Sequence, residues 1–140
     1  MHYLLDTCVL SEVIKPEPVP SVIEWLDSAD ESTLYLSVLT LGEIQKGISG
    51  LPDGRRKRQL QQWLDDDLSQ RFSGRILPVC TRTAGDWGII AGNAGRQGQA
   101  VPVIDGLLAA TARQHDLTLV TRNTADFEML GVNLMNPWRD

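Results

Sequence analysis

The residues of this sequence that could most clearly take part in a chemical reaction are carboxylates that lie beside apolar segments. Asp6 follows the apolar residues 3–5, and Asp105 follows the apolar residues 101–104. Carboxylates that are brought together repel one another, and at a dry site they require protons or cations to neutralise them. Their hard oxygens suit Mg²⁺ or Mn²⁺, which often bind a phosphate as well. A cluster of such groups would therefore indicate metal-assisted hydrolysis of a phosphodiester.

Each acidic residue also has a structural interpretation. Asp105 precedes a helical pattern, where Asp is a preferred N-cap, and Asp126 lies near a helix start, where its charge suits the dipole. Glu43 and Thr40 together match a capping box. Asp6 is the hardest to explain in this way, because we expect a carboxylate at a strand end to gain little from capping. The metal-site hypothesis depends on whether the fold brings these residues together.

The elements that must position these residues alternate between strands and helices. We expect strands over residues 3–5, 34–37, 76–79, 117–121 and 132–135. We expect helices over residues 9–14, 21–28, 40–48, 55–68, 83–97, 105–115 and 126–130. This alternation predicts an α/β fold, in one domain over residues 1–140, with a parallel sheet covered on both faces. Ligands of such sheets collect beyond the carboxyl ends of the strands, where Asp6, Ser37 and Arg122-Asn123 are expected.

Composition narrows the class of protein. The chain has 42% hydrophobic and 22% charged residues, as in ordinary soluble globular proteins. No apolar run approaches the roughly 18 residues that span a bilayer, and we see no signal peptide, so we expect a cytoplasmic protein without a membrane partner. The net charge of −5 argues against broad, charge-driven nucleic-acid binding, but not against a nucleic-acid enzyme that holds metal ions.

Other chemistries fit the sequence less well. No glycine-rich phosphate loop follows the first strand. An aspartyl-phosphate phosphatase would carry a second Asp two residues after Asp6, where this chain has Cys8. No Ser or Cys has an evident His partner for nucleophilic catalysis. Cys8 and Cys80 fit no metal-ligand spacing, and we expect both to be small buried hydrophobes.

Five segments in order resemble the PIN-domain ribonucleases, specifically the VapC toxins of type II toxin–antitoxin systems. They read YLLDTCVLSE, YLSVLTLGEIQKGI, GLPDGRRKRQLQQWL, VPVIDGLLAATARQHDLTLVTRNTADFE and NPW. The resemblance covers nearly the whole chain, and the TLGEIQKG and NPW segments are similar to the FitB-like branch of the family. It implies a three-layer α/β/α sandwich with a central, mostly parallel sheet and an acidic pocket that binds Mg²⁺ or Mn²⁺.

The resemblance also assigns roles to residues of this chain. It implies that Asp6, Asp105 and Glu43 are the metal ligands, with Glu43 completing the site or orienting the attacking water. A fourth position lies in TRNTADF, where either Asn123 or Asp126 fills it. We count Asp126 with the catalytic set.

The same resemblance implies roles for residues around these carboxylates. Thr7 is expected to donate a hydrogen bond near the site, and Asn123 to hold water there. Cys8 is a departure, because Asn or Ser is commoner at that position of the family. Arg122 is the best candidate for contact with an RNA phosphate, since it follows a strand end. For the basic residues 55–58, we prefer the interpretation as a solvated helix face, with the aliphatic stems packed down, to contact with RNA.

The implied function is that of the toxin in a type II toxin–antitoxin pair, a Mg²⁺-dependent endoribonuclease that hydrolyses RNA phosphodiester bonds. The implied partners are a VapB-like antitoxin, RNA, a second copy of the chain in a homodimer, and operator DNA in a higher assembly. Apolar faces near residues 41–51 and Trp63 are candidates for the dimer contact. The alternatives are a PIN fold that has lost catalysis and only binds a partner, and a DNA nuclease.

Overall fold

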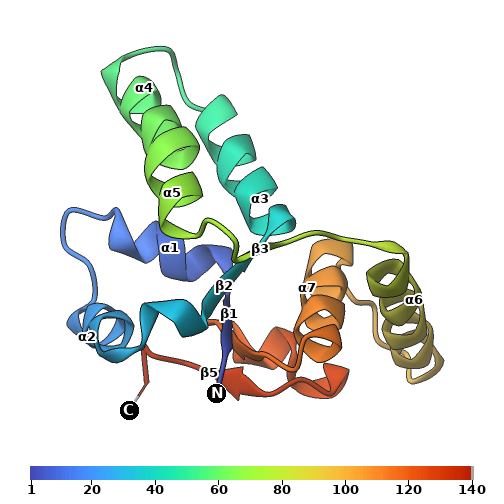
Figure 1. The fold of residues 1–140 in the computed structure, drawn as a ribbon. Helices are drawn as coiled ribbons and strands as arrows, with labels where there is room; N and C mark the ends of the chain where they lie inside the picture. Colours follow the sequence, from blue (N-terminus) through green and yellow to red (C-terminus); the bar gives the residue numbers. More distant parts are fainter. Residues whose placement is uncertain (140) are drawn as a thin grey trace.

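The computed structural model describes residues 1–139 and has a central sheet of five parallel strands in the order β3-β2-β1-β4-β5 (Figure 1). The strands are β1 (Tyr3–Leu5), β2 (Leu34–Ser37), β3 (Ile76–Leu77), β4 (Thr118–Val120) and β5 (Leu134–Met135). In the central strand β1, Leu4 pairs with Tyr35 on one side and with Leu119 on the other. The predicted α/β class and parallel sheet are therefore confirmed.

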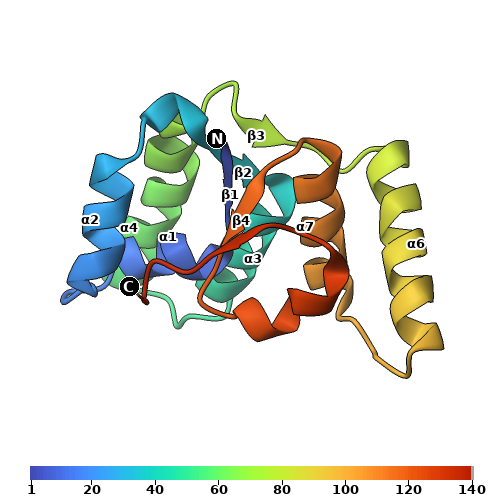
Figure 2. The same cartoon turned by 90° about the horizontal axis from the view of Figure 1, so that it is seen from below.

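Helices cover both faces of the sheet, as Figures 1 and 2 show. One layer contains α1 (Thr7–Val13), α2 (Pro20–Ser28), α3 (Val38–Ser49), α4 (Arg55–Gln62), a π-helical segment (Trp63–Leu68) and α5 (Ser69–Arg71). The other layer contains α6 (Thr81–Arg96) and α7 (Val103–Gln114). The helices and the sheet thus form the three-layer α/β/α sandwich that was expected.

The hydrophobic core has two halves, one on each face of the sheet. Successive strand residues point to opposite faces, so Leu4 belongs to the half under α6 and α7, whereas Leu5 belongs to the half under α1 to α5. Leu119 and Val120 of β4 divide in the same way. Because both faces of these strands are buried, the central strands read as continuous apolar runs, and the polar residues gather where the strands end.

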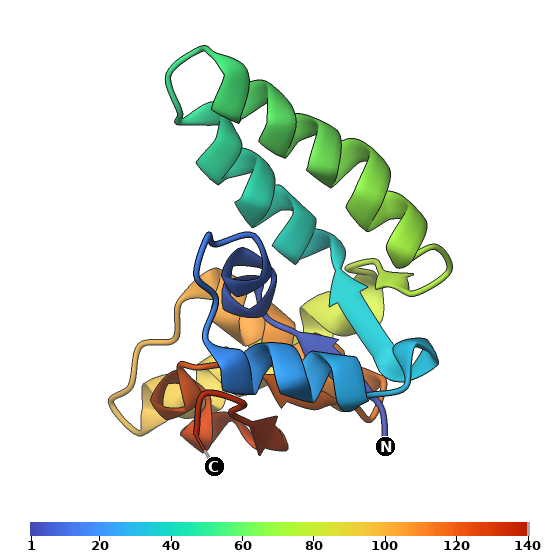
Figure 3. The same ribbon diagram turned by 90° about the vertical axis from the view of Figure 1, so that its left-hand side faces the viewer.

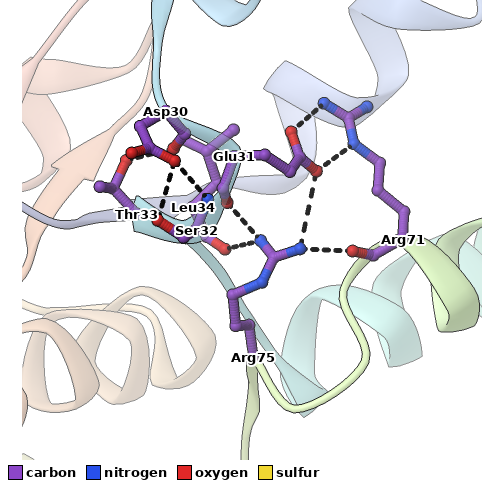
Figure 4. Close-up of polar contacts among 7 residues, drawn as sticks. All are labelled: Asp30, Glu31, Ser32, Thr33, Leu34, Arg71 and Arg75. Atoms are coloured by element: carbon purple, nitrogen blue, oxygen red, sulfur yellow. Dashed lines mark hydrogen bonds and ion pairs between the residues drawn. The ribbon is translucent and has the colours of Figure 1, made fainter.

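The helix α3 and the long helix from α4 to α5 form a hairpin that projects from the sheet (Figure 3). Arginines fix the end of this hairpin that returns to the sheet to the turn before β2, as Figure 4 shows. Arg71 donates from Nε to Oε1 of Glu31 at 2.7 Å, and Arg75 donates from Nη1 to the carbonyl of Glu31 at 2.6 Å. These contacts hold the chain in place as it turns from α5 toward the edge strand β3.

Two local expectations from the sequence are wrong. The helix α3 begins at Val38 and is capped by Ser37, whose Oγ accepts from the backbone N–H of Leu39 at 3.0 Å, so Thr40 and Glu43 form no capping box. Cys80 is exposed rather than buried, because it lies outside the core at the start of α6. Of residues 1–139, no stretch forms a helix both long and apolar enough for a bilayer span.

Candidate active site

Asp6 lies between β1 and α1, directly after the carboxyl end of the central strand. Its Oδ1 accepts from the backbone N–H of Thr7 at 2.8 Å, and its Oδ2 accepts from the hydroxyl of Thr121 at 2.8 Å. Asp6 is therefore the N-cap of α1, a role that the sequence interpretation had discounted. The two hydrogen bonds fix the carboxylate, and because the residue is 8% exposed, only a small part of it is accessible to solvent.

Glu43 is brought to Asp6 by a link between α1 and α3. The hydroxyl of Thr7 donates to Oε1 of Glu43 at 2.6 Å. Since Ser37 caps α3, Glu43 is not needed for capping and lies in the second turn of the helix with its carboxylate beside the start of α1. Oε1 retains a lone pair, and Oε2 has both, for a water or a cation.

Asp105 reaches the same place from the other helical layer. It lies in the first turn of α7, whose N-cap is Pro102, so the expectation that Asp105 itself caps this helix is wrong. Burial first, and then the negative charges of Asp6, Asp126 and Glu43, together raise the pKa of Asp105 to about 6. The charges of three carboxylates from other segments therefore act on Asp105 in addition to its burial.

An open pocket of about 400 Å³ collects these groups. Its lining residues are Asp6, Thr7, Cys8, Ser11, Lys15, Glu43, Asp105, Arg122 and Asn123. We call it the acidic pocket. It holds six of the seven residues that were predicted for the site, together with Ser11 and Lys15, which sequence reasoning missed.

The seventh, Asp126, lies apart from the acidic pocket. It is exposed at the end of a 3₁₀ turn (Thr124–Asp126) and lines a neighbouring pocket with Val101 and Pro102. Asn123 has the non-helical angles φ −93° and ψ 51° and precedes this turn, and it lines the acidic pocket. Of the two candidates for the fourth position, only Asn123 therefore lines the acidic pocket, although Asp126 still acts on Asp105 through its charge.

Cys8 is a neutral partner of the carboxylates. Its Sγ lies 3.8 Å from Oδ2 of Asp6 and 3.8 Å from the hydroxyl of Thr121. Burial, more than the charge of Asp6, raises the pKa of the Cys8 thiol. The thiol therefore stays protonated at neutral pH and is a weak hydrogen-bond donor toward Asp6.

The donor set suits a hydrated hard cation. Within residues 1–139, no three His, Cys, Asp or Glu side chains converge into a ready-made metal cage. Mg²⁺ does not require one, since it keeps several waters and commonly binds one or two carboxylates plus a phosphate. Asp6 and Asp105 could hold such an ion in the acidic pocket, with Glu43 beside them, and its charge would favour the ionised form of Asp105 against the burial and the neighbouring charges that raise its pKa.

An apolar groove adjoins the acidic pocket and shares Thr7, Ser11 and Glu43 with it. Its volume is about 200 Å³. The remaining lining residues are Ile14, Ile44, Gly47, Ile48, Leu51, Leu60 and Trp63. The groove therefore runs from the carboxylates along the hairpin of α3 and α4.

Comparison with known proteins gives a consistent result. The family model described as PIN domain matches residues 3–131. The chain is 39% identical over 137 residues to a protein named toxin FitB from Neisseria gonorrhoeae, covering 98% of this chain and 99% of the relative. It is 35% identical over 135 residues to a protein named VapC ribonuclease Y4jK from Sinorhizobium fredii, covering 96% of each.

A solved structure is similar to this chain in its three-dimensional fold as well. It is described as FitAB bound to an IR36 DNA fragment, and it superposes with a TM-score of 0.93 at 37% identity. The match covers 99% of this chain and 96% of the other.

Proposed function

Because this chain belongs to the PIN domain family, we propose that it is the toxin of a type II toxin–antitoxin pair and acts as a divalent-metal-dependent endoribonuclease. The observation that carries the proposal is the acidic pocket, which gathers Asp6, Glu43 and Asp105 and raises the pKa of Asp105 to about 6. The names of the relatives, toxin FitB and VapC ribonuclease, support the same function.

The roles of the side chains follow from their contacts. Asp6 and Asp105 would hold Mg²⁺, or Mn²⁺ in its place, through carboxylate oxygens. Such an ion supplies charge neutralisation and Lewis acidity to phosphodiester hydrolysis. Thr7 fixes Oε1 of Glu43 by its hydrogen bond, which leaves Oε2 to orient a water toward the phosphorus. Asn123 can accept a hydrogen bond from that water or a neighbouring one through its amide oxygen.

The presence of all three central carboxylates favours catalysis over a silent partner-binding role. A protein that only bound a partner would gain nothing from keeping mutually repelling acids at one pocket. The choice of RNA rather than DNA is supported by the ribonuclease names of the relatives. We infer that the chain acts in the cytoplasm, where RNA and a co-expressed antitoxin are at hand.

We further propose that a VapB-like antitoxin inhibits the chain by laying a tail along the apolar groove. The groove ends at Thr7 and Glu43, so an Arg at the end of such a tail could pair with the carboxylates in place of the metal. A structure of the relatives described as FitAB bound to DNA supports a toxin–antitoxin complex on operator DNA. We also expect a homodimer, as the resemblance to the family implies.

The test is cleavage by the purified chain of an RNA and of a single-stranded DNA of the same sequence, each with Mg²⁺ and with excess EDTA. We expect cleavage of RNA alone, and only with Mg²⁺. Cleavage of DNA with equal efficiency would reassign the substrate. No cleavage of either, by a chain that still binds an antitoxin, would favour the silent partner-binding role.

A further inference from the structure

A buried carboxylate outside the acidic set organises the side of the acidic pocket that carries positive charge. Glu12, in α1, is 1% exposed, although an isolated ionised carboxylate is costly in the protein interior. It is satisfied by three donors from separate segments. Oε2 accepts from the backbone N–H of Val19 at 3.0 Å, and Oε1 accepts from Nζ of Lys15 at 3.0 Å and from Nε1 of Trp138 at 3.2 Å.

Trp138 in turn holds Arg122. The guanidinium of Arg122 lies over the indole ring, with 5.3 Å between Cζ and the ring centroid. Asn136 fixes the backbone of both residues, because its Nδ2 donates to the carbonyl of Arg122 at 3.4 Å and its Oδ1 accepts from the N–H of Trp138 at 3.0 Å. Figure 2 shows the C-terminal segment leaving the sheet toward α1 and α2, where Glu12 receives the indole N–H.

The two cations that are held in this way line the acidic pocket together. Lys15 is bound to Glu12 directly and Arg122 through Trp138, and both are exposed residues of the pocket lining. Free side chains of this length would lose rotamer entropy on binding a ligand, and the contacts with Glu12 and Trp138 remove part of that cost in advance. The carboxylates of the same pocket repel a polyanion, and fixed cations beside them favour its approach.

We infer that Glu12 and Trp138 are positioning residues that hold Lys15 and Arg122 at the acidic pocket, where these two cations bind phosphates of the RNA. The inference rests on the proposed function for the identity of the ligand. It adds Lys15 to the RNA contacts and gives the C-terminal Asn-Pro-Trp segment a role in substrate binding. A purely structural role for the same contacts is the competing outcome.

The test is a double-mutant cycle of Trp138→Leu and Arg122→Ala, with KM and kcat measured on RNA with Mg²⁺ and the RNA Kd measured against salt in EDTA. Arg122→Ala should raise KM about tenfold, which corresponds to about 1.4 kcal/mol, with kcat little changed. It should also lower the slope of log K against log salt by about 0.7. Trp138→Leu should raise KM by a similar factor alone and add little in the Arg122→Ala background.

Two further variants separate positioning from folding. Trp138→Phe keeps a ring under Arg122 but loses the N–H to Glu12, so its KM should lie between those of the wild type and Trp138→Leu. If Trp138→Leu does not fold, Trp138→Phe takes its place in the cycle. Trp25→Phe is the matched control, since Trp25 packs edge-on against Tyr3 in the same half of the core and does not line the pocket. Its KM should equal that of the wild type.

Glu12→Gln tests whether Glu12 is the group that holds Lys15 directly and Arg122 through Trp138. It removes the charge that holds Lys15, and it should raise KM more than Trp138→Leu does. Additive effects in the cycle, an unchanged KM in Trp138→Leu, or a wild-type KM in Glu12→Gln would overturn the inference while leaving the ribonuclease proposal intact. A wild-type chain that binds no RNA at any salt concentration would overturn both.

Discussion

The hydroxyl of Thr7 donates a hydrogen bond of 2.6 Å to Oε1 of Glu43, and this contact joins the first turn of α1 to the second turn of α3. It places a carboxylate from one segment beside Asp6 from another, because Asp6 and Thr7 are adjacent. The site is therefore assembled by side chains on helix starts and is not confined to the strand ends.

Replacing Thr7 by Val keeps its shape but removes this donor. We expect kcat on RNA to fall about tenfold, because a hydrogen bond to a charged group contributes about 1.5–3 kcal/mol and here it fixes the orientation of Glu43. Thr7→Ser retains the hydroxyl and should keep most of the activity. A Thr7→Val protein with the wild-type rate would show that the contact does not orient Glu43 for catalysis.

The raised pKa of Asp105 determines how the stability of the metal-free protein should depend on pH. The carboxyl titrates near 3.8 when unperturbed and near 6 in the folded chain, so between these pH values the folded state holds a proton that the unfolded state has lost. Stability therefore falls as pH rises through this window. Asp105→Asn carries no such charge. It should raise the free energy of unfolding at pH 7.5 by about 1 kcal/mol, since solvent screening reduces the full value of about 3 kcal/mol.

Urea unfolding in EDTA at pH 4 and pH 7.5 measures this difference. The gain of Asp105→Asn over the wild type should be smaller at pH 4, where the wild-type carboxyl is largely protonated. A destabilised Asp105→Asn at pH 7.5 would instead indicate that Asp105 stabilises the first turn of α7.

Asn123 and Asp126 should have separable effects on catalysis. Asp126 lies outside the acidic pocket and acts on Asp105 by charge, so Asp126→Asn should raise the Mg²⁺ concentration that gives half-maximal activity. Asn123 lines the acidic pocket, so Asn123→Ala should lower the rate at saturating Mg²⁺. Metal titrations of cleavage measure both quantities. Wild-type curves for the two variants would reduce the catalytic set to Asp6, Glu43 and Asp105.

Gly106 is required because a tryptophan approaches the start of α7. A Cβ at this position would lie 2.7 Å from Cδ1 and 2.9 Å from Nε1 of Trp87. Gly106→Ala should destabilise the chain by about 1–3 kcal/mol, as overpacking does, and should lower activity because it displaces the adjacent Asp105. Thermal unfolding and RNA cleavage measure the two effects.

Gly42→Ala is the matched control for this substitution. Gly42 is next to Glu43 as Gly106 is next to Asp105, and a Cβ there would meet no heavy atom within 4 Å. Gly42→Ala should therefore be neutral or stabilise by up to about 1 kcal/mol, because Ala is the better helix former. Equal effects of the two substitutions would show that the contact with Trp87 does not constrain Gly106.

Much of the fold could be predicted from the sequence because apolar runs and helical periodicity report the burial of each element. The strand Tyr3–Leu5 and its carboxylate at Asp6 followed from such a run, and parallel pairing followed from the alternation of elements. The resemblance to PIN-domain proteins supplied the choice of Glu43 and Asp105 as partners of Asp6. All three line one pocket.

The rest of the site depends on contacts between distant parts of the chain. Glu12 and Trp138 are separated by 126 positions, and nothing in the local pattern of α1 distinguishes a buried Glu from a solvated one. Lys15 was missed for the same reason, since its place beside the pocket depends on Glu12. The cap at Ser37 was missed because Thr40 and Glu43 have the right spacing for a capping box three residues further on.

The central claim is that the acidic pocket binds a divalent cation for RNA cleavage, and the most direct test measures both properties on the same samples. Mn²⁺ binding is followed by electron paramagnetic resonance, and cleavage of an RNA is followed in parallel, for the wild type and Asp6→Asn. We predict that the wild type binds Mn²⁺ and cleaves, and that Asp6→Asn loses both while its circular dichroism spectrum stays unchanged. Cleavage by a folded Asp6→Asn chain, or wild-type cleavage in excess EDTA, would contradict the account.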